Sequence, residues 1–109
     1  MPTTLPPPIA AYLHAANARD AEAIAACFAD DAMVIDERRE MHGIAAIRAW
    51  REQTFKQYRV TVDVVGAEHA GDRTIVTARV AGDFAGSPVE LRYDFRLAGG
   101  KIAVLEIRQ

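Results

Sequence analysis

Apolar residues recur at helical spacing near the start of the chain, directly after three prolines at positions 6–8. Proline is tolerated in the first turn of a helix, so a helix can follow these prolines without a break. Steps of three and four residues predict that this helix buries one face. The stripe comprises Ile9, Tyr12, Leu13 and Ala16.

A second, shorter helix is predicted after Asp20, because an aspartate can accept a hydrogen bond from the backbone at a helix N-terminus. Its expected inward face comprises Ala23, Ile24, Cys27 and Phe28. Asp30 and Asp31 are expected to end this helix. Residues 32–36 then read as a short apolar strand and residues 37–42 as a charged loop.

Gly43 is expected to begin a third helix. Its inward stripe comprises Ile44, Ile47, Trp50, Arg51, Thr54 and Phe55. A large aromatic side chain on such a stripe usually anchors the core. Trp50 is therefore interpreted as a core residue, with a role as a platform for a ligand as the alternative.

The pattern changes from helical spacing to alternation at Tyr58. Alternating segments are expected at 58–64, 74–84, 89–97 and 101–108, separated by turns at 71–72, 86–88 and 99–100. Helices followed by hairpin-linked strands favour an α+β domain with helices on one face of an antiparallel sheet. The 109 residues are the length of one domain, so we expect a single domain over 1–109.

Composition excludes several classes of protein. Thirteen Lys and Arg against fifteen Asp and Glu give a net charge of −2, which does not suit a nucleic-acid-binding surface. No segment has the length of apolar sequence that a membrane span or a secretion signal needs. The single cysteine, Cys27, is expected to be a small buried residue. We therefore expect a soluble, cytoplasmic protein.

The sequence contains none of the motifs that mark nucleotide binding, serine hydrolases or zinc proteases. Its histidines, His14, His42 and His69, lie far apart on segments expected to be exposed. We therefore expect no metal site and no cofactor.

Four polar residues fall at inward or core-edge positions: Tyr12, Asp36, Tyr58 and Tyr93. A carboxylate facing phenols across an apolar pocket suits proton abstraction next to a carbonyl, because phenols can stabilise the enolate oxygen. In the alternative, the tyrosines only pack, and Asp36 caps the following loop through backbone amides. The pattern of residues leaves both possibilities open.

The sequence resembles the NTF2-like superfamily, and within it the SnoaL-like and ketosteroid-isomerase-like branch. The resemblance is carried by residues 12–20, 28–36 (FADDAMVID), 43–48 and 95–102. It implies a cone, in which a curved antiparallel sheet wraps around three N-terminal helices and encloses a pocket. It also implies a homodimer through the outer face of the sheet. The superfamily hosts many activities, and some members only bind ligands.

The resemblance also implies roles for individual residues. Ketosteroid isomerases use an aspartate base with a tyrosine and a protonated aspartic acid as donors to the oxyanion. Asp36 corresponds to the base and Tyr12 to the tyrosine, whereas Tyr93 replaces the protonated acid. Asp94, next to Tyr93, has the opposite strand parity and is expected to face outward. The charged segment 37–40 suggests a smaller or more polar ligand than a steroid, unless it is only a solvated loop.

Two functions follow as hypotheses. The first is an isomerase or cyclase-type lyase that needs no cofactor and acts on a small apolar or aromatic carbonyl compound through Asp36, Tyr12 and Tyr93. The second is a protein that binds such a ligand without turning it over. In both, the residues expected to line the ligand are Trp50, Tyr58, Phe28 and Phe95. In a third possibility, side chains fill the cone and no useful cavity exists.

Overall fold

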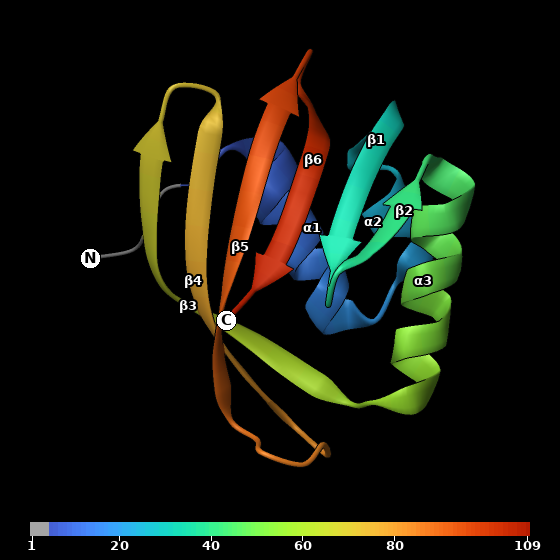
Figure 1. Cartoon of the computed structure of the whole chain (residues 1–109), viewed down its shortest axis with the longest axis vertical. Coiled ribbons are helices and arrows are strands. Elements are labelled where there is room, and N and C mark those ends of the chain that lie inside the picture. The colour runs from blue at the N-terminus through green and yellow to red at the C-terminus, as the bar shows by residue number, and fades with distance from the viewer. Residues whose placement is uncertain (1–4) are drawn as a thin grey trace.

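The computed structural model describes residues 5–109, so residues 1–4 of the predicted domain lie outside it. In this part of the chain three helices and one six-stranded sheet form an α+β fold (Figure 1). The helices are α1 (Pro7–Ala18), α2 (Ala21–Ala25) and α3 (Ile44–Gln57). The strands are β1 (Phe28–Asp36), β2 (Arg39–His42), β3 (Val60–Ala70), β4 (Arg73–Gly82), β5 (Val89–Ala98) and β6 (Lys101–Arg108).

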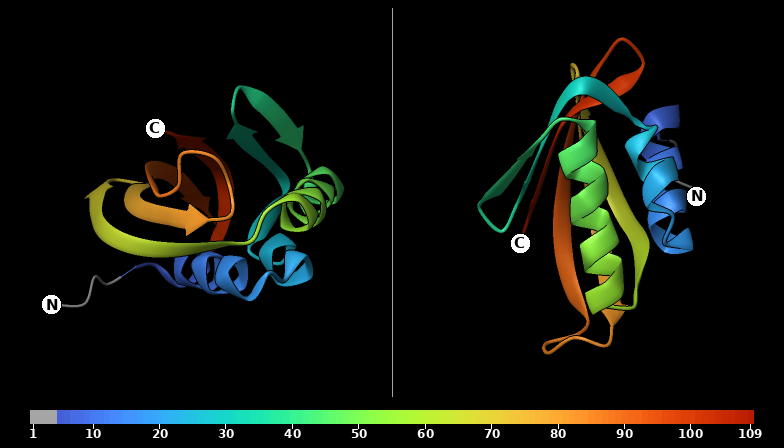
Figure 2. Two further views of the ribbon diagram at one scale, coloured as in Figure 1. Left: turned by 90° about the horizontal axis from the view of Figure 1, so that it is seen from below. Right: turned by 90° about the vertical axis from the view of Figure 1, so that its right-hand side faces the viewer.

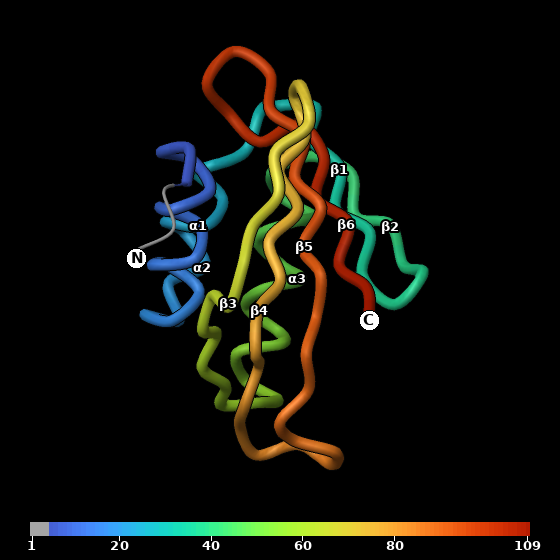
Figure 3. Tube along the Cα trace, turned by 90° about the vertical axis from the view of Figure 1, so that its left-hand side faces the viewer, coloured from blue at the N-terminus to red at the C-terminus, as the bar shows by residue number. Residues whose placement is uncertain are grey.

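The strand order across the sheet is β2-β1-β6-β5-β4-β3. Every neighbouring pair is antiparallel except β1 and β6, which are parallel. The sheet is curved and unclosed, with α1 and α2 along one side of it (Figures 2 and 3). Helix α3 packs against β1 and β2 and also against α2. The predicted α+β fold with helices against one face of a curved sheet is confirmed.

Helix α1 forms as the sequence predicts, whereas α2 begins as predicted but ends at Ala25, so Asp30 and Asp31 lie in β1 instead of ending this helix. Helix α1 has proline in its first turn and ends at Arg19, whose backbone is left-handed with φ of 57°. The carboxylate of Asp20 then accepts a hydrogen bond of 3.0 Å from the Ala23 amide, which caps α2. The buried stripe of α1 includes Ile9 and Tyr12, both with no exposed surface.

Strand β1 begins at Phe28, four residues earlier than predicted. The amide of Ile102 donates a 2.9 Å hydrogen bond to the carbonyl of Cys27, so pairing with β6 already starts here. The register of this pair shifts between Phe28 and Met33. The irregularity interrupts the alternation of buried and exposed residues, which is why sequence spacing extended the preceding helix too far.

The charged segment after Asp36 is a β-hairpin rather than the predicted loop. Arg39–His42 pairs antiparallel with β1. The two turn residues, Glu37 and Arg38, have φ of 52° and 67°. Two-residue turns with positive φ normally use asparagine or glycine, so this sequence carried no turn signal. The hairpin places Arg39 directly opposite Asp36.

Two further boundaries differ from the prediction. Tyr58 ends α3 instead of beginning a strand, and 45% of its surface is exposed, so it is not an inward residue of the core. Strand β4 ends at Gly82, which leaves Phe84 in the connection to β5. The predicted turns at 71–72, 86–88 and 99–100 all separate strands as expected.

The core lies between the helices and the inner face of the sheet. Its largest fully buried side chains are Tyr12, Phe95, Ile9, Ile24, Ile47, Ile102, Leu105, Val34 and Val76. Cys27 is also buried, and its thiol donates to the carbonyl of Ala23. Burial raises the pKa of the Cys27 thiol, which fits the expected packing role better than a reactive one.

Candidate functional site

A cavity of about 890 Å³ lies between α3, the end of β1 and the strands β3 to β6. This volume is in the range of small-molecule sites, so side chains do not fill the interior of the fold. Its wall is mixed in character, with apolar, aromatic and charged residues. It includes Asp36, Glu37, Arg38, Arg39, Trp50, Arg51, Phe55, Tyr58, Val62, Leu91, Tyr93, Ile107 and Arg108.

Asp36 is the last residue of β1, and its carboxylate lines this cavity. Its Oδ2 accepts a hydrogen bond of 3.2 Å from the indole Nε1 of Trp50. Within residues 5–109 the carboxylate accepts no hydrogen bond from a backbone amide and forms no ion pair, so it does not cap the turn that follows. Burial raises the pKa of Asp36, and the charge of Arg51 and the Trp50 hydrogen bond oppose that shift.

Tyr93 faces the same cavity from β5. Strand register sets it opposite Ile107, which in turn lies opposite Asp36, so both polar side chains belong to the inner face of the sheet. The Tyr93 hydroxyl makes no hydrogen bond within residues 5–109, which leaves its O–H available to a ligand. Burial raises the pKa of Tyr93 well above its ordinary value. The group is therefore a neutral phenol at physiological pH.

Tyr12 lies deeper, with no exposed surface, and does not line the cavity. Its ring packs edge-on against Phe28 and Phe95, with ring centres 5.9 and 5.5 Å apart. The centre of the Tyr93 ring lies 6.5 Å away. The Tyr12 hydroxyl accepts a hydrogen bond from Nη2 of Arg51. The structure thus brings Tyr12 close to the site but directs its hydroxyl at a guanidinium instead of the open space.

Arg51 is the site residue that sequence reasoning missed. Its guanidinium lies 3.9 Å from the centre of the Trp50 ring and lines the cavity beside Asp36. The signal was present in the sequence: a charged residue falls on the inward stripe of α3, between Trp50 and Thr54. A permanent charge on an apolar stripe indicates either a partner or a function.

The residues expected to line the ligand divide into two groups. Trp50 and Tyr58 are on the cavity wall, as expected. Phe95 is fully buried under Tyr12, and Phe28 also packs against Tyr12 instead of the cavity. Their large rings made them candidates, but in the structure these rings support Tyr12. Trp50 is 4% exposed, which fits the core role expected for it, and its indole also contacts Asp36.

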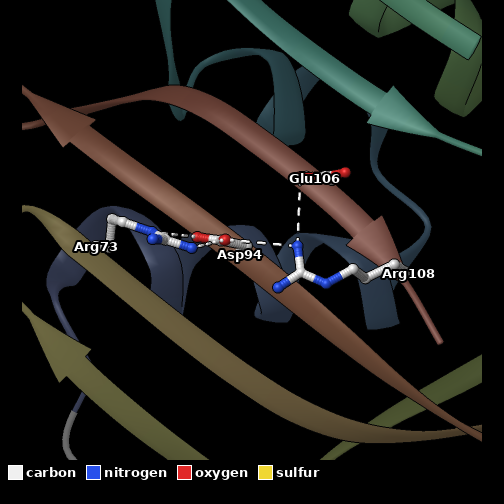
Figure 4. Close-up of polar contacts among 4 residues, drawn as sticks. All are labelled: Arg73, Asp94, Glu106 and Arg108. Atoms are coloured by element: carbon white, nitrogen blue, oxygen red, sulfur yellow. Dashed lines mark hydrogen bonds and ion pairs between the residues drawn. The ribbon is translucent and has the colours of Figure 1, made fainter. Parts of the chain in front are cut away.

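Asp94 lies on the opposite face of the sheet from Tyr93, as its strand parity predicts. Figure 4 shows it between Arg73 and Arg108, with Glu106 beside Arg108. Arg73 donates two hydrogen bonds to its carboxylate, one of them 3.3 Å long, and Arg108 Nη1 lies 3.6 Å from it. The hydrogen bonds from Arg73 lower the pKa of Asp94. Despite its outward position only 5% of the residue is exposed, because the arginines cover it.

Neither a metal nor a membrane is indicated by the described residues. Residues 5–109 contain no group of three His, Cys, Asp or Glu side chains placed to hold a metal ion. The three histidines are all exposed. In the same range, no helix has the length and apolar character needed to cross a membrane.

The fold defines an NTF2-like domain, in which the curved sheet and the helices surround the cavity. The family model for the SnoaL-like domain matches residues 9–105, and the chain belongs to this family. No curated protein matches it.

Three solved structures illustrate the relationship. A proposed polyketide cyclase from Sinorhizobium meliloti is 36% identical, with a TM-score of 0.92 over 95% of each chain. A protein from Catenulispora acidiphila with a ketosteroid-isomerase-like fold is 24% identical, with a TM-score of 0.86 over 97% of this chain and 87% of that one. A proposed polyketide cyclase from Pseudomonas putida is also 24% identical, with a TM-score of 0.83 over 99% and 92%.

Proposed function

We propose that the protein is an enzyme that removes a proton next to a carbonyl group, with Asp36 as the general base. The observation that carries the proposal is the position of Asp36: a half-buried carboxylate on the wall of a cavity, with a raised pKa and one neutral hydrogen-bond donor. In its ionised form, a carboxylate of raised pKa abstracts protons more strongly than an ordinary aspartate.

The proposed first step needs no cofactor. The Asp36 carboxylate takes the α-proton, the electron pair of the broken C–H bond forms the C=C bond of an enolate, and the negative charge passes to the carbonyl oxygen. The neutral hydroxyl of Tyr93 donates a hydrogen bond to that oxygen. In a double-bond isomerisation, Asp36 then returns the proton to another carbon. In an aldol-type cyclisation, the enolate carbon first attacks a second carbonyl group of the substrate, which forms the new C–C bond and leaves an alkoxide, and Asp36 returns the proton to that alkoxide. Description of the 36% identical S. meliloti protein as a proposed polyketide cyclase supports the second outcome.

The role that we propose for Tyr12 differs from the one that the resemblance to ketosteroid isomerases implies. Its hydroxyl is held by Arg51 and does not line the cavity, so it does not reach an enolate oxygen in this arrangement. We propose that Tyr12 positions Arg51. The charge of Arg51, in turn, opposes the effect of burial and helps to keep Asp36 ionised.

The test is exchange of α-protons for deuterium in neutral aryl ketones, followed by NMR. Wild type should catalyse exchange in at least one ketone of the panel, and Asp36→Asn should lower the rate about 10²- to 10⁴-fold. Asp31→Asn is the matched control, because Asp31 is an exposed carboxylate on the same strand. An Asp36→Asn protein that exchanges as fast as wild type excludes Asp36 as the base.

A second candidate function is binding without turnover, which the contacts of the polar groups favour. Asp36 already accepts a hydrogen bond from Trp50, and Tyr12 is already bonded to Arg51. The same experiment separates the two functions. Ketones that quench the fluorescence of Trp50, the only tryptophan of the chain, but show no Asp36-dependent exchange would establish a binding protein.

We also propose a cytoplasmic, single-domain protein that forms a homodimer through the outer face of the sheet. Partly buried apolar residues on that face support the dimer: Met33, Ile35, Ile75 and Val104. Light scattering coupled to gel filtration should give twice the mass of the 11.9 kDa chain. A monomer at all concentrations from micromolar to millimolar would contradict the dimer.

A further inference from the structure

Arg51 forms no ion pair at contact distance with any described residue, although its charge opposes the rise that burial causes in the pKa of the neighbouring Asp36. Within residues 5–109 Arg51 forms no ion pair, and its guanidinium, which carries five N–H groups, donates one hydrogen bond to the neutral Tyr12 hydroxyl. Its Nε is buried without a partner. Charges removed from water are normally paired at contact distance, and among residues 5–109 no anion lies at that distance from Arg51.

Aromatic rings hold the guanidinium in place. It lies over Trp50 at 3.9 Å and near the rings of Tyr12 and Phe55 at 5.5 and 5.8 Å. Stacking of this kind orients a guanidinium while leaving its N–H edge free. Since Arg51 lines the cavity, a ligand held there can contact this side chain.

The charges around Arg51 also favour an anion. The chain as a whole has a net charge of −2, yet the cavity wall carries four arginines against two carboxylates. Arg108 is already paired on the outer face, whereas Arg38 and Arg39 are exposed at the mouth. The positive side chains of the cavity therefore exceed the negative ones even though the protein is acidic.

We propose that the ligand is a carboxylate-bearing ketone, whose carboxylate binds Arg51 while its α-carbon faces Asp36. This inference rests on the proposed function for the role of Asp36, but the anion site depends on Arg51 alone. A planar guanidinium matches the two oxygens of a carboxylate. Arg51 and Asp36 line the same cavity of about 890 Å³, so one small molecule can contact both.

The test compares two probes that differ in one charge: 4-oxo-4-phenylbutanoate and its methyl ester. Binding is followed by the fluorescence of Trp50, which contacts both Arg51 and Asp36. Wild type should bind the acid about tenfold or more tightly than the ester, because a hydrogen bond to a charged group is stronger than one to a neutral group. Equal affinity for the two probes would overturn the proposal. This comparison needs no variant.

Arg51→Gln should remove the preference, with the affinity for the acid falling about tenfold and the affinity for the ester changing little. Arg48→Gln is the matched control, because Arg48 is an exposed arginine on the same helix and does not line this cavity. An unchanged preference in a folded Arg51→Gln protein would also overturn the proposal.

The two proposals fail in different ways. Asp36-dependent exchange in neutral ketones, together with equal binding of acid and ester, would retain the base and exclude the anion site. An Arg51-dependent preference for the acid, with exchange unaffected by Asp36→Asn, would retain the anion site and exclude the base.

Discussion

Two aspartates on opposite faces of the same sheet have opposite environments. Asp36, at the end of β1, faces the cavity and accepts a hydrogen bond from a neutral indole. Asp94, on β5, is covered by Arg73 and Arg108 on the outer face. The pKa of Asp36 is raised by burial, whereas the pKa of Asp94 is lowered by its hydrogen bonds with Arg73.

The difference shows how one residue type can serve two purposes. A carboxylate with two guanidinium partners is stabilised as an anion, so it is a poor base and contributes to stability. A buried carboxylate with few charged or hydrogen-bonding partners destabilises the folded protein when it is ionised. The same surroundings raise its pKa and so make it a stronger base. Burial alone does not distinguish them, because both are largely removed from water. The two aspartates differ in the charge of the groups that donate hydrogen bonds to them: a neutral indole for Asp36 and a guanidinium for Asp94.

The largest expected effect on stability is at Asp94. Asp94→Asn should lower the free energy of unfolding by about 1–3 kcal/mol at pH 7, since a buried carboxylate loses its charge-assisted hydrogen bonds to a partly exposed arginine. Asp36→Asn should leave it unchanged or raise it, because a poorly compensated charge is removed. Urea denaturation at one protein concentration measures both. Asp63→Asn, an exposed carboxylate of β3, should stay within about 0.5 kcal/mol of wild type. If Asp36→Asn lowers the free energy of unfolding more than Asp94→Asn does, the proposed difference between the two environments is wrong.

The two residues should also respond to pH with opposite sign. For Asp94 the folded pKa is lowered, so its contribution is present above the unfolded pKa of about 3.9 and is lost as pH falls through the folded pKa. For Asp36 the folded pKa is raised, so wild type gains stability relative to Asp36→Asn as pH falls from that pKa towards about 3.9. Urea titrations of wild type and both variants between pH 3 and 7, a range of about four units around these values, would show the two trends. Parallel trends would contradict the assignment of environments.

A smaller change tests the single hydrogen bond to Asp36. Trp50→Phe keeps an aromatic ring but removes the indole N–H that stabilises the charged carboxylate. The pKa of Asp36 should therefore rise further, and the acidic limb of the pH profile of kcat/KM should move to higher pH. A limb that stays in place would mean that the hydrogen bond is unimportant for the base.

The sequence was sufficient to predict the fold, but only part of the site. Helical and alternating patterns predicted all three helices and the hairpins from β3 to β6. The β1–β2 hairpin was missed, because Glu37 and Arg38 adopt positive φ without the usual turn residues. The resemblance to the NTF2-like superfamily predicted that Asp36, Tyr12 and Tyr93 share one site. In the structure, all three lie near one cavity.

Side-chain direction was the part that sequence spacing could not predict. Tyr12 and Arg51 both lie on inward stripes, but which of them reaches the cavity depends on how the α1 and α3 side chains meet. The same is true of Phe95, an inward residue that supports Tyr12 instead of lining the open space. The spacing of apolar residues along the chain identifies the buried face of a helix or strand. Whether a residue on that face contacts the cavity depends on neighbours that are distant in sequence.

The central claim is that the cavity face makes Asp36 a stronger base than an ordinary aspartate, while the outer face makes Asp94 a weaker one. The most direct measurement is an NMR titration of the two side-chain carboxyl carbons in the wild-type protein, assigned with the Asp36→Asn and Asp94→Asn variants. We expect the pKa of Asp36 to lie above the ordinary value of about 3.9 and that of Asp94 below it. An Asp36 pKa at or below the ordinary value would contradict the claim.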